Sequence, residues 1–324
     1  MNTKEAVFDI LSSEIGKTVS GEELAAQLGV SRASIWKAVK ALKNDGHIID
    51  ARQNAGYALR AGNVLSQKLI GNHLNNPELA KIIEIYPSVT STNNVAKQYA
   101  AENGCGSPIE KIFIANYQTA GRGRRGRNFY SPEGSGIYMS FLLCPKVSAF
   151  EAVRFTTVAS VAVCMAIEKS FGLKPGIKWV NDVFLGGRKI CGILTEAVTD
   201  FETGDVDSIV IGIGVNTSAV ELPEELKSIV GFLSDEELDR NKLIAEIINC
   251  LTELIEVTDS RIEIKDYIGE YKKRSMVLGK TIKILNTDET AEALDIDEKG
   301  GLIVRTDSGI KTLESGEISI RLAE

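Results

Sequence analysis

A glycine- and arginine-rich segment at residues 118–127 limits the fold of this chain more than any other feature. Three of its residues stand at the G-x-G-x-x-G spacing of dinucleotide-binding loops: Gly121, Gly123 and Gly126. In a dinucleotide-binding fold such a loop opens a helix. Here Pro132, Gly134 and Gly136 follow, and these residues prevent a helix from starting. The sequence therefore excludes the dinucleotide-binding fold.

What remains is a loop with four arginines in the six residues 122–127. Arginine forks bind phosphate oxygens in pairs, and glycines let backbone N–H groups approach an anion. Because like charges at this density repel one another, we expect the loop to be mobile until a polyvalent anion such as a nucleoside triphosphate binds. The alternatives are a solvated basic turn and a second nucleic-acid contact. A P-loop is excluded, since Leu11 and Arg274 stand where the first glycine of G-x-x-x-x-G-K-T would be.

Around this loop, residues 65–270 alternate between strand and helix patterns. Apolar runs at 111–116 and 208–215 predict strands, and 152–170 predicts a long buried helix. An amphipathic helix is predicted at 241–258, with these side chains inward: Leu243, Ile247, Leu251, Leu254 and Ile255. Such a mixture of elements indicates an α/β or α+β domain.

A second charged cluster lies at residues 178–196. Gly186 and Gly187 predict the tight turn of a hairpin, which brings Lys178, Asp182 and Lys189 close together. Two cations and a carboxylate can hold magnesium-bound phosphate, whereas the alternative is an ordinary charged surface. The strand at 211–216 carries two glycines that leave room either for a ligand or for another strand: Gly212 and Gly214.

The first sixty residues predict a winged helix-turn-helix. Ser20 and Glu23 have capping-box spacing, and Gly29 ends the helix that they begin. Ser31 starts a second helix, whose apolar side is Ile35, Val39 and Leu42. A hairpin with its turn at 53–56 follows as the wing.

The charge of this first domain differs from that of the rest of the chain. Residues 1–60 carry five Lys and three Arg against three Asp and four Glu, a net charge of +1, while the whole chain is at −7. The second helix has no acidic residue, and its candidate DNA contacts are Ser31, Arg32, Ser34, Trp36, Lys37 and Lys40. Basic side chains suit DNA phosphates, and such domains read paired half-sites, so we expect DNA binding by a twofold dimer. The alternative is a solvated helix face.

Short strand patterns separated by Asp, Asn and Gly turns fill residues 275–324 and predict a small β-barrel. The five cysteines are dispersed and odd in number, so we expect reduced thiols in a cytoplasmic protein, without zinc: Cys105, Cys144, Cys164, Cys191 and Cys250. No signal peptide and no run of membrane-spanning length are present in the sequence. We therefore expect no membrane partner.

With these motifs, nearly the whole chain resembles the biotin protein ligases, in particular the bifunctional type that also represses the biotin operon. The resemblance rests on the winged helix-turn-helix, the arginine-rich loop, the segment Lys178 to Asp182, the strand 212–216 and the small C-terminal domain. Two positions depart from the family pattern. Val180 replaces the proline of K-W-P-N-D, and Phe129 stands where Trp is common.

The resemblance implies an α+β multidomain protein with three parts: a winged helix-turn-helix at 1–62, a mixed α/β adenylating domain at 65–272 and a small β-barrel at 275–324. It assigns catalysis to Lys189, Arg122 and Arg124. It assigns biotin binding to Ser91, Thr92, Asn93, Gln118, Arg122, Gly123, Arg124, Lys189 and Gly192. It assigns ATP and adenylate binding to Gly121, Arg124, Arg127, Phe129, Lys178, Asn181, Asp182 and Asn216, with Asp182 as a magnesium ligand.

The activity that the resemblance implies is ATP-dependent formation of biotinyl-5′-AMP, followed by transfer of biotin to a lysine of the biotin carboxyl carrier protein of acetyl-CoA carboxylase. The implied cofactors and ligands are biotin, ATP and Mg²⁺. The implied partners are the carrier domain, operator DNA and a second copy of the chain when the adenylate is bound. A repressor that senses a small molecule without chemistry, and a ligase for another acid such as lipoate, are the alternatives.

Overall fold

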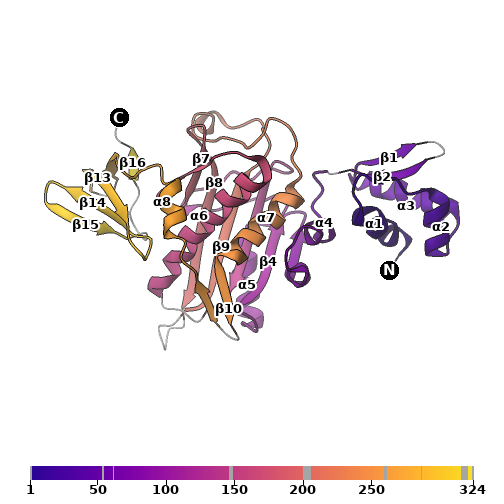
Figure 1. The fold of residues 1–324 in the computed structure, drawn as a ribbon, viewed down its shortest axis with the longest axis horizontal. Coiled ribbons are helices and arrows are strands. Elements are labelled where there is room, and N and C mark those ends of the chain that lie inside the picture. The colour runs from indigo at the N-terminus through magenta and orange to yellow at the C-terminus, as the bar shows by residue number, and fades with distance from the viewer. Residues whose placement is uncertain are drawn as a thin grey trace.

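The computed structural model describes residues 2–52, 55–60, 62–145, 149–199, 206–258, 261–285, 287–314 and 320–322. The chain forms three consecutive parts, with the N-terminal and C-terminal parts on opposite sides of a large central sheet (Figure 1). Among the described helices, none has the length and apolarity needed to cross a membrane.

The N-terminal part is a winged helix-turn-helix, as predicted. It consists of α1 Thr3–Ser13, α2 Gly21–Leu28, α3 Arg32–Asn44, β1 Ile49–Arg52 and β2 Gly56–Leu59. Ser20 caps α2 by accepting from Glu23 N, and Ser31 caps α3 by accepting from Ser34 N. Gly29 ends α2 in the left-handed conformation, at φ 65°. The predicted wing turn includes Gln53 and Asn54, which lie outside the described residues. The apolar core of this part is formed by its helices and strands, with Leu69 of the following helix Gln67–Gly71 packed into it.

The central part is built on a seven-stranded mixed sheet with the order β3-β4-β5-β9-β8-β7-β6. Its strands are β3 Ile83–Tyr86, β4 Ile109–Ala115, β5 Gly136–Leu143, β6 Gly176–Lys178, β7 Asp182–Leu185, β8 Arg188–Thr199 and β9 Val206–Asn216. Its helices are α4 Gln67–Gly71, η1 Pro77–Ile82, α5 Thr92–Asn103, η2 Arg124–Gly126, α6 Ala149–Phe171, η3 Glu224–Leu226, α7 Arg240–Glu253 and α8 Ile268–Arg274. The predicted turn at Gly186–Gly187 joins β7 to β8.

Alternation along the strands divides the sheet into two faces. Phe113, Leu142 and Val210 pack with Ala96 of α5 in a small cluster on one face. Their neighbours along the chain point the other way, into the main core with α6 and α7: Ile112, Ile114, Phe141, Leu143, Ile209 and Ile211. The long helices α6 and α7 therefore cover one face, and α5 covers part of the other.

The predicted helix at 241–258 is wrong at its C-terminal end. Helix α7 ends at Glu253, and Ile255–Thr258 forms β10, which pairs with β11 Arg261–Ile264. Ile255, Val257 and Thr258 are β-branched, which favours a strand. Leu254 and Ile255 are buried, as predicted, but they belong to the junction between helix and strand.

Helix α7 also holds the linker that leads from the N-terminal part. Arg240 is almost fully buried, and its guanidinium donates to Asn63 O at 2.5 Å and to Gly136 O at 2.9 Å. Burial lowers the pKa of Arg240 to about 10. Asn241 accepts from Ser66 N at 2.9 Å and donates to Val64 O at 2.9 Å. These bonds fix the linker to the central part after residue 62.

The C-terminal part is a five-stranded antiparallel sheet with the order β15-β14-β13-β12-β16. The strands are β12 Thr281–Ile284, β13 Glu289–Ile296, β14 Leu302–Thr306, β15 Gly309–Leu313 and β16 Ile320–Leu322. Within the described residues, β15 and β16 are the two edges, so the strands are described as a sheet and not as a closed barrel. The core of this part continues into the main core of the central part.

The prediction that all five cysteines are reduced is wrong for two of them. Cys105 and Cys144 form a disulfide that joins the loop after α5 to the end of β5. Their sequence separation is 39 residues, and the fold of β4 between them brings them together. Cys164, Cys191 and Cys250 are buried free thiols, as predicted.

We expect the disulfide to stabilise the oxidised protein. A cross-link over a sequence separation of 39 residues restricts the unfolded chain and contributes about 3 kcal/mol to the free energy of unfolding. Urea unfolding followed by the fluorescence of Trp179, which lies in the same domain, should show that a reductant lowers the midpoint of the oxidised wild type. The midpoint of Cys105→Ser should not respond to the reductant. Equal midpoints of the wild type with and without reductant would contradict the bond.

Candidate functional site

The candidate site lies on the α5 face of the central sheet, where three strands place small or polar side chains side by side. Tyr138 of β5, Gly214 of β9 and Gly192 of β8 are direct partners in one row across the strands. The next row consists of Ser140, Gly212 and Leu194. Partners in a row share one face of the sheet, so these rows form a continuous floor.

The glycines of β9 make room for two other side chains of the site. A Cβ on Gly212 would lie 2.2 Å from Asn93 Oδ1, and a Cβ on Gly214 would lie 2.5 Å from the Phe129 ring. Neither distance is possible for real atoms, so any larger residue would displace Asn93 or Phe129. Both glycines also line the cavity, which fits the prediction of room for a ligand, and they receive two side chains of the site as well.

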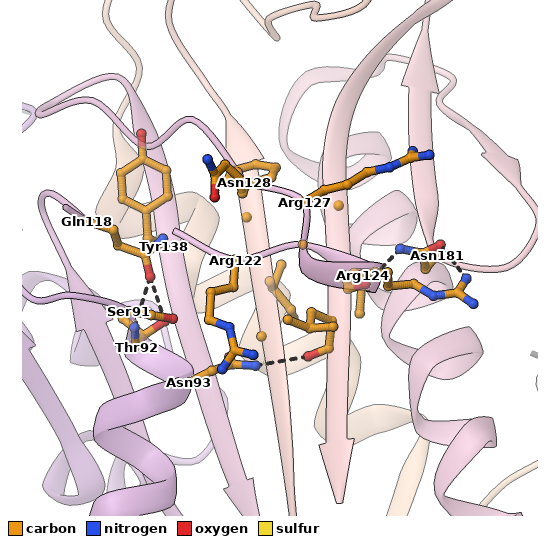
Figure 2. A pocket seen from close by; sticks show the side chains of 18 of the residues that line it. Ser91, Thr92, Asn93, Gln118, Arg122, Arg124, Arg127, Asn128, Tyr138 and Asn181 are labelled. Carbon is orange, nitrogen blue, oxygen red and sulfur yellow. Dashed lines mark hydrogen bonds between the residues drawn. The ribbon is translucent and has the colours of Figure 1, made fainter. Parts of the chain in front are cut away.

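A cavity of about 150 Å³ opens above this floor. It brings together most of the predicted site residues: Ser91, Thr92, Asn93, Gln118, Arg122, Gly123, Arg124, Arg127, Phe129, Asn181, Asp182, Lys189 and Gly192. Pockets for drug-sized ligands hold roughly 300–1,000 Å³. The arginine loop lies across the cavity, so it must move outward before a large ligand enters. Figure 2 shows Gln118 and Thr92 at one end, Arg124 and Asn181 at the other, and Arg122 between them.

The Gln118 end of the cavity has a fixed hydrogen-bonding pattern. Gln118 Oε1 accepts from Thr92 N at 2.9 Å, and its amide nitrogen donates to Ser131 Oγ at 3.0 Å. Ser140, fully buried on β5, donates to Asn93 Oδ1 at 2.6 Å and lies 2.7 Å from Thr92 Oγ1. A buried pocket with oriented amides and hydroxyls recognises a neutral polar group by its donors and acceptors.

The arginine loop follows a compact path that backbone hydrogen bonds hold together, and its mobility without a ligand stays a prediction. Phe129 N donates to Gly121 O at 2.9 Å, and Gly123 N donates to Arg127 O at 2.7 Å. The arginines also point to different partners, which offsets their repulsion. Arg122 Nη1 donates to Asn94 Oδ1 at 3.2 Å, and Arg124 Nη1 donates to Asn181 Oδ1 at 3.1 Å.

Opposite charges meet at the Arg124 end. Lys189 Nζ lies 2.6 Å from Asp182 Oδ1, and both side chains are about one-quarter exposed. Burial lowers the pKa of Arg124, while the nearby Asp182 carboxylate opposes that shift. Arg124 stays charged because the ordinary pKa of arginine lies far above neutral. A phosphate entering here would meet two cations in a partly buried place, where electrostatic attraction is stronger than in water.

Three predicted ligand-binding residues do not line the cavity. A Cβ on Gly121 would lie 2.3 Å from Phe129 O, so Gly121 serves the packing of the loop. Lys178 Nζ lies over the Phe184 ring, 5.8 Å from its centre. Asn216 donates to Lys189 O at 3.4 Å, which places it beside the backbone of the catalytic candidate.

The cavity also contains residues that sequence reasoning missed: Arg125, Asn128, Tyr138, Met139, Ile193, Leu194, Gly212, Ile213 and Gly214. Of these, Gly212 and Gly214 were missed only as assigned site residues, since the sequence already predicted room for a ligand beside them. Ile213 lies between them on β9, and the others lie on β5 and β8 or in the loop. The period-two positions of the strand residues alone do not tell which face of the sheet carries a site.

The segment after Lys178 is held by α8 and by the C-terminal part of the chain. The Trp179–Val180 peptide bond is cis, so Val180 adopts this geometry although it is not a proline. Trp179 Nε1 donates to Gly300 O at 3.0 Å, and Tyr271 Oη donates to Val180 O at 3.2 Å. These two bonds anchor the turn that presents Asn181 and Asp182 to the cavity.

The chemistry of the donor set limits which metal fits. Within the described residues, no three His, Cys, Asp or Glu side chains cluster as metal ligands. Asp182 is the acidic side chain that lines the cavity. Magnesium often takes one or two carboxylates and completes its shell with water and substrate phosphates. The residues therefore fit magnesium brought by a phosphate ligand, and they do not fit a zinc site.

A second candidate surface lies on α3, far from the cavity (Figure 1). Arg32, Trp36, Lys37 and Lys40 are exposed, and Lys40 Nζ lies 5.2 Å from the centre of the Trp36 ring. The hydroxyl of Ser31 serves as the helix cap and that of Ser34 bonds to it at 2.9 Å. The exposed basic side chains form a surface suited to DNA phosphates.

Comparisons with known proteins match all three parts. The model of the biotin/lipoate A/B protein ligase family matches residues 85–216, an HTH domain model matches 4–58, and a biotin protein ligase C-terminal domain model matches 277–321. The bifunctional ligase/repressor BirA of Bacillus subtilis is 31% identical over 98% of both chains. Its namesake in Escherichia coli is 31% identical over 95% of both chains.

A solved structure agrees with these relatives. The biotin protein ligase of Aquifex aeolicus in complex with biotin and ATP superposes with a TM-score of 0.62. It is 28% identical in sequence and covers 75% of this chain and 100% of its own.

Proposed function

This chain belongs to the biotin/lipoate A/B protein ligase family, as one of its bifunctional ligase/repressors, and from that premise we propose a division of its activities between the two candidate sites. The cavity activates biotin with ATP and transfers it to a lysine of a carrier protein. The winged helix-turn-helix binds operator DNA and represses transcription. The domain boundaries that we propose are 1–62, 65–272 and 275–324.

Biotin occupies the Gln118 end of the cavity in this proposal. The oriented amides and hydroxyls of Gln118, Thr92 and Asn93 match the donors and acceptors of a ureido ring. Arg122 lies between that end and the phosphate end, where the carboxylate of the bound acid would come to lie. Ser91, Gly123, Arg124 and Gly192 complete the biotin site.

ATP occupies the Arg124 end. The biotin carboxylate attacks the α-phosphorus, a new oxygen–phosphorus bond forms, and the bond to pyrophosphate breaks, which leaves a mixed anhydride. Negative charge spreads over the phosphate oxygens in the transition state, and Lys189, Arg122 and Arg124 are placed to stabilise it. The nucleotide is bound by four residues that line the cavity: Arg127, Phe129, Asn181 and Asp182. Three further residues support the backbone of the nucleotide site: Gly121, Lys178 and Asn216.

Asp182 would hold Mg²⁺ together with the phosphates. When bound, the ion supplies positive charge to the oxygens of the nucleotide. The pairing of Asp182 with Lys189 at 2.6 Å keeps both side chains in place in its absence.

Transfer follows when the amine of a carrier lysine attacks the carbonyl carbon of the anhydride and AMP leaves. A closed loop keeps water from that anhydride. We propose the biotin carboxyl carrier domain of acetyl-CoA carboxylase as the acceptor, a cytoplasmic location, and a homodimer of the adenylate-bound form on paired half-sites.

One observation carries the ligase proposal: a single cavity joins an oriented polar end to a cationic end with one carboxylate. Biotin-dependent exchange of labelled pyrophosphate into ATP tests it directly. We expect exchange that requires both biotin and magnesium. Exchange with lipoate in place of biotin would assign the alternative substrate, and no exchange with either acid would support a sensor without chemistry.

Gly214→Ala is expected to weaken nucleotide use. The new Cβ would lie 2.5 Å from the Phe129 ring, and overpacking of this kind disfavours the native geometry by about 1–3 kcal/mol. We expect the KM for ATP to rise about tenfold, because Phe129 must leave its place. Gly269→Ala is the matched control, since nothing lies within 4 Å of its Cβ position. An unchanged KM in Gly214→Ala would remove Phe129 from the nucleotide site.

A further inference from the structure

We propose that Glu196 is a positioning residue that orients Asn93 and holds Arg122 for ligand binding in the cavity. This inference rests on the proposed function of the cavity. Glu196 lies on β8, two residues beyond Leu194 of the floor, and it does not line the cavity. Its carboxylate instead reaches two residues that do.

The contact with Asn93 gives its amide nitrogen a second and closer acceptor besides Leu194 O, to which it donates at 3.3 Å. Asn93 Nδ2 donates to Glu196 Oε2 at 2.8 Å, and Asn93 Oδ1 accepts from Ser140 at 2.6 Å. A carboxylate only accepts hydrogen bonds, so the group that faces it must be the amide nitrogen. The orientation of Asn93 then directs the proton of the buried Ser140 hydroxyl. Glu196, together with Leu194 O, thus sets the donor and acceptor pattern at this end of the floor, and it supplies the charged acceptor of the two.

The contact with Arg122 connects the floor to the loop above it. Arg122 Nη1 lies 3.5 Å from Glu196 Oε1 and donates to Asn94 Oδ1 at 3.2 Å. Figure 2 shows Arg122 extending from the loop toward the start of α5, where Asn93 lies. The Glu196 carboxylate on β8 therefore contacts both Asn93 at the start of α5 and Arg122 of the arginine loop.

A third residue contacts the Glu196 carboxylate from outside the cavity. Lys97, one turn after Asn93 on α5, donates to Glu196 Oε1 at 2.9 Å. The Glu196 side chain is 22% exposed, against 46% for Arg122. The Lys97 contact therefore anchors Glu196, and the contacts with Asn93 and Arg122 transmit its position to the cavity.

Glu196→Gln tests the proposal because it preserves shape and removes charge. A glutamine side chain offers an amide that can face Asn93 with either its oxygen or its nitrogen, and it no longer attracts Arg122. Loss of a hydrogen bond to a charged group in such a place typically weakens binding by about tenfold or more. We expect the KM for biotin to rise by that factor, with kcat and the KM for ATP within about twofold of the wild type.

Glu84→Gln is the matched control. Glu84 lies on β3 of the same sheet and pairs with Lys111 at 2.8 Å, but it is outside the cavity. This variant should leave all three kinetic constants unchanged. Equal effects of Glu84→Gln and Glu196→Gln would reduce the role of Glu196 to general stability and overturn the proposal.

A double-mutant cycle separates positioning from support of the fold. Because Glu196 acts through Asn93, the effect of Glu196→Gln on the KM for biotin should shrink in an Asn93→Ala background. Additive effects would overturn the proposal, and so would a fall of the KM in Glu196→Gln, which would mean that Glu196 competes with biotin for Arg122.

Tryptic cleavage of the ligand-free protein provides a readout that does not depend on enzyme activity. Loss of the Arg122 contact should speed cleavage within residues 122–127 in Glu196→Gln but not in Glu84→Gln. If the wild type is inactive with biotin, the proposed function is contradicted, but the cleavage experiment still tests whether Glu196 holds Arg122. If the wild type is active but Glu196→Gln changes neither the cleavage rate nor the KM for biotin, only the positioning role of Glu196 is contradicted.

Discussion

Lys189→Met is expected to lower the rate of biotin adenylation about a hundredfold to a thousandfold. Lys189 lines the cavity beside Asp182, at the end where we place the phosphates. Removing one preorganised donor that stabilises transition-state charge typically has an effect of this size. Methionine preserves most of the length of the side chain, so the loss measures the ammonium group. Pyrophosphate exchange under saturating biotin and ATP gives the rate.

The control for this variant is Lys242→Met, which removes an exposed lysine of α7. It should retain full activity. Biotin binding by Lys189→Met, measured by calorimetry, establishes that the pocket is still formed. If Lys189→Met keeps more than a tenth of the wild-type rate, the phosphates do not bind where we place them.

Deletion of residues 1–60 is expected to abolish operator binding and to leave ligation within about threefold of the full chain. The core of the N-terminal part is built mostly from residues of that part, although it also includes Leu69 of α4. The linker bonds to Arg240 and Asn241 involve Asn63, Val64 and Ser66, which the deletion retains. A mobility-shift assay with duplex DNA from upstream of the biotin genes, and a ligation assay on the same preparations, measure the two outcomes.

A full-length variant separates loss of the surface from loss of the domain. Replacing Arg32, Lys37 and Lys40 by alanine should weaken DNA binding strongly, and the binding that remains should depend less on salt, because fewer phosphate contacts release fewer counterions. Replacing Lys4 and Lys17, which are charged residues of the same domain outside α3, should leave binding near that of the wild type. If the truncated chain loses ligation, the two parts are coupled through more than the linker bonds, for example through Asn72, which donates to Ser12 O at 2.7 Å.

Local signals in the sequence predicted local structure well. Serine caps, the glycine that ends α2 and the turn at Gly186–Gly187 depend on residues a few positions apart, and the structure confirms each of them. The exclusion of a dinucleotide-binding fold also depended on neighbours of the loop, and β5 indeed begins at Gly136 without an intervening α-helix. Helix α1 was not predicted, although Asn2 and Glu5 form a capping box at its start and Val7 and Leu11 are its buried apolar positions.

Features that depend on distant residues escaped sequence reasoning. Gly212 and Gly214 were recognised as close approaches, but their neighbours Asn93 and Phe129 come from other parts of the chain. The same holds for the Cys105–Cys144 disulfide and for the bond between Glu196 and Asn93. Arg122 and Arg124 likewise find partners on α5 and beside β7 that no local pattern reveals.

Of the site residues, those in the arginine loop and in the hairpin could be assigned to phosphate chemistry from their residue types alone. Ser91, Thr92, Asn93 and Gln118 could not, because single polar residues at a helix start or in a loop carry no specific signal. Their assignment came from resemblance, and the structure brings them to one end of the same cavity. The identification of the bound acid as biotin therefore depends on similarity to known proteins. The proposal that a polar group lies at one end of the cavity and a phosphate at the other depends on the geometry of the cavity.

Transfer of biotin to a carrier lysine tests the central claim most directly. Purified protein is incubated with ATP, magnesium, biotin and the biotin carboxyl carrier domain, and the carrier is analysed by intact mass and by streptavidin binding. We predict a carrier heavier by one biotinyl group, only when ATP and biotin are both present and not when the acceptor lysine is replaced by arginine. An unmodified carrier under these conditions, with the protein folded and able to bind biotin, would contradict the account.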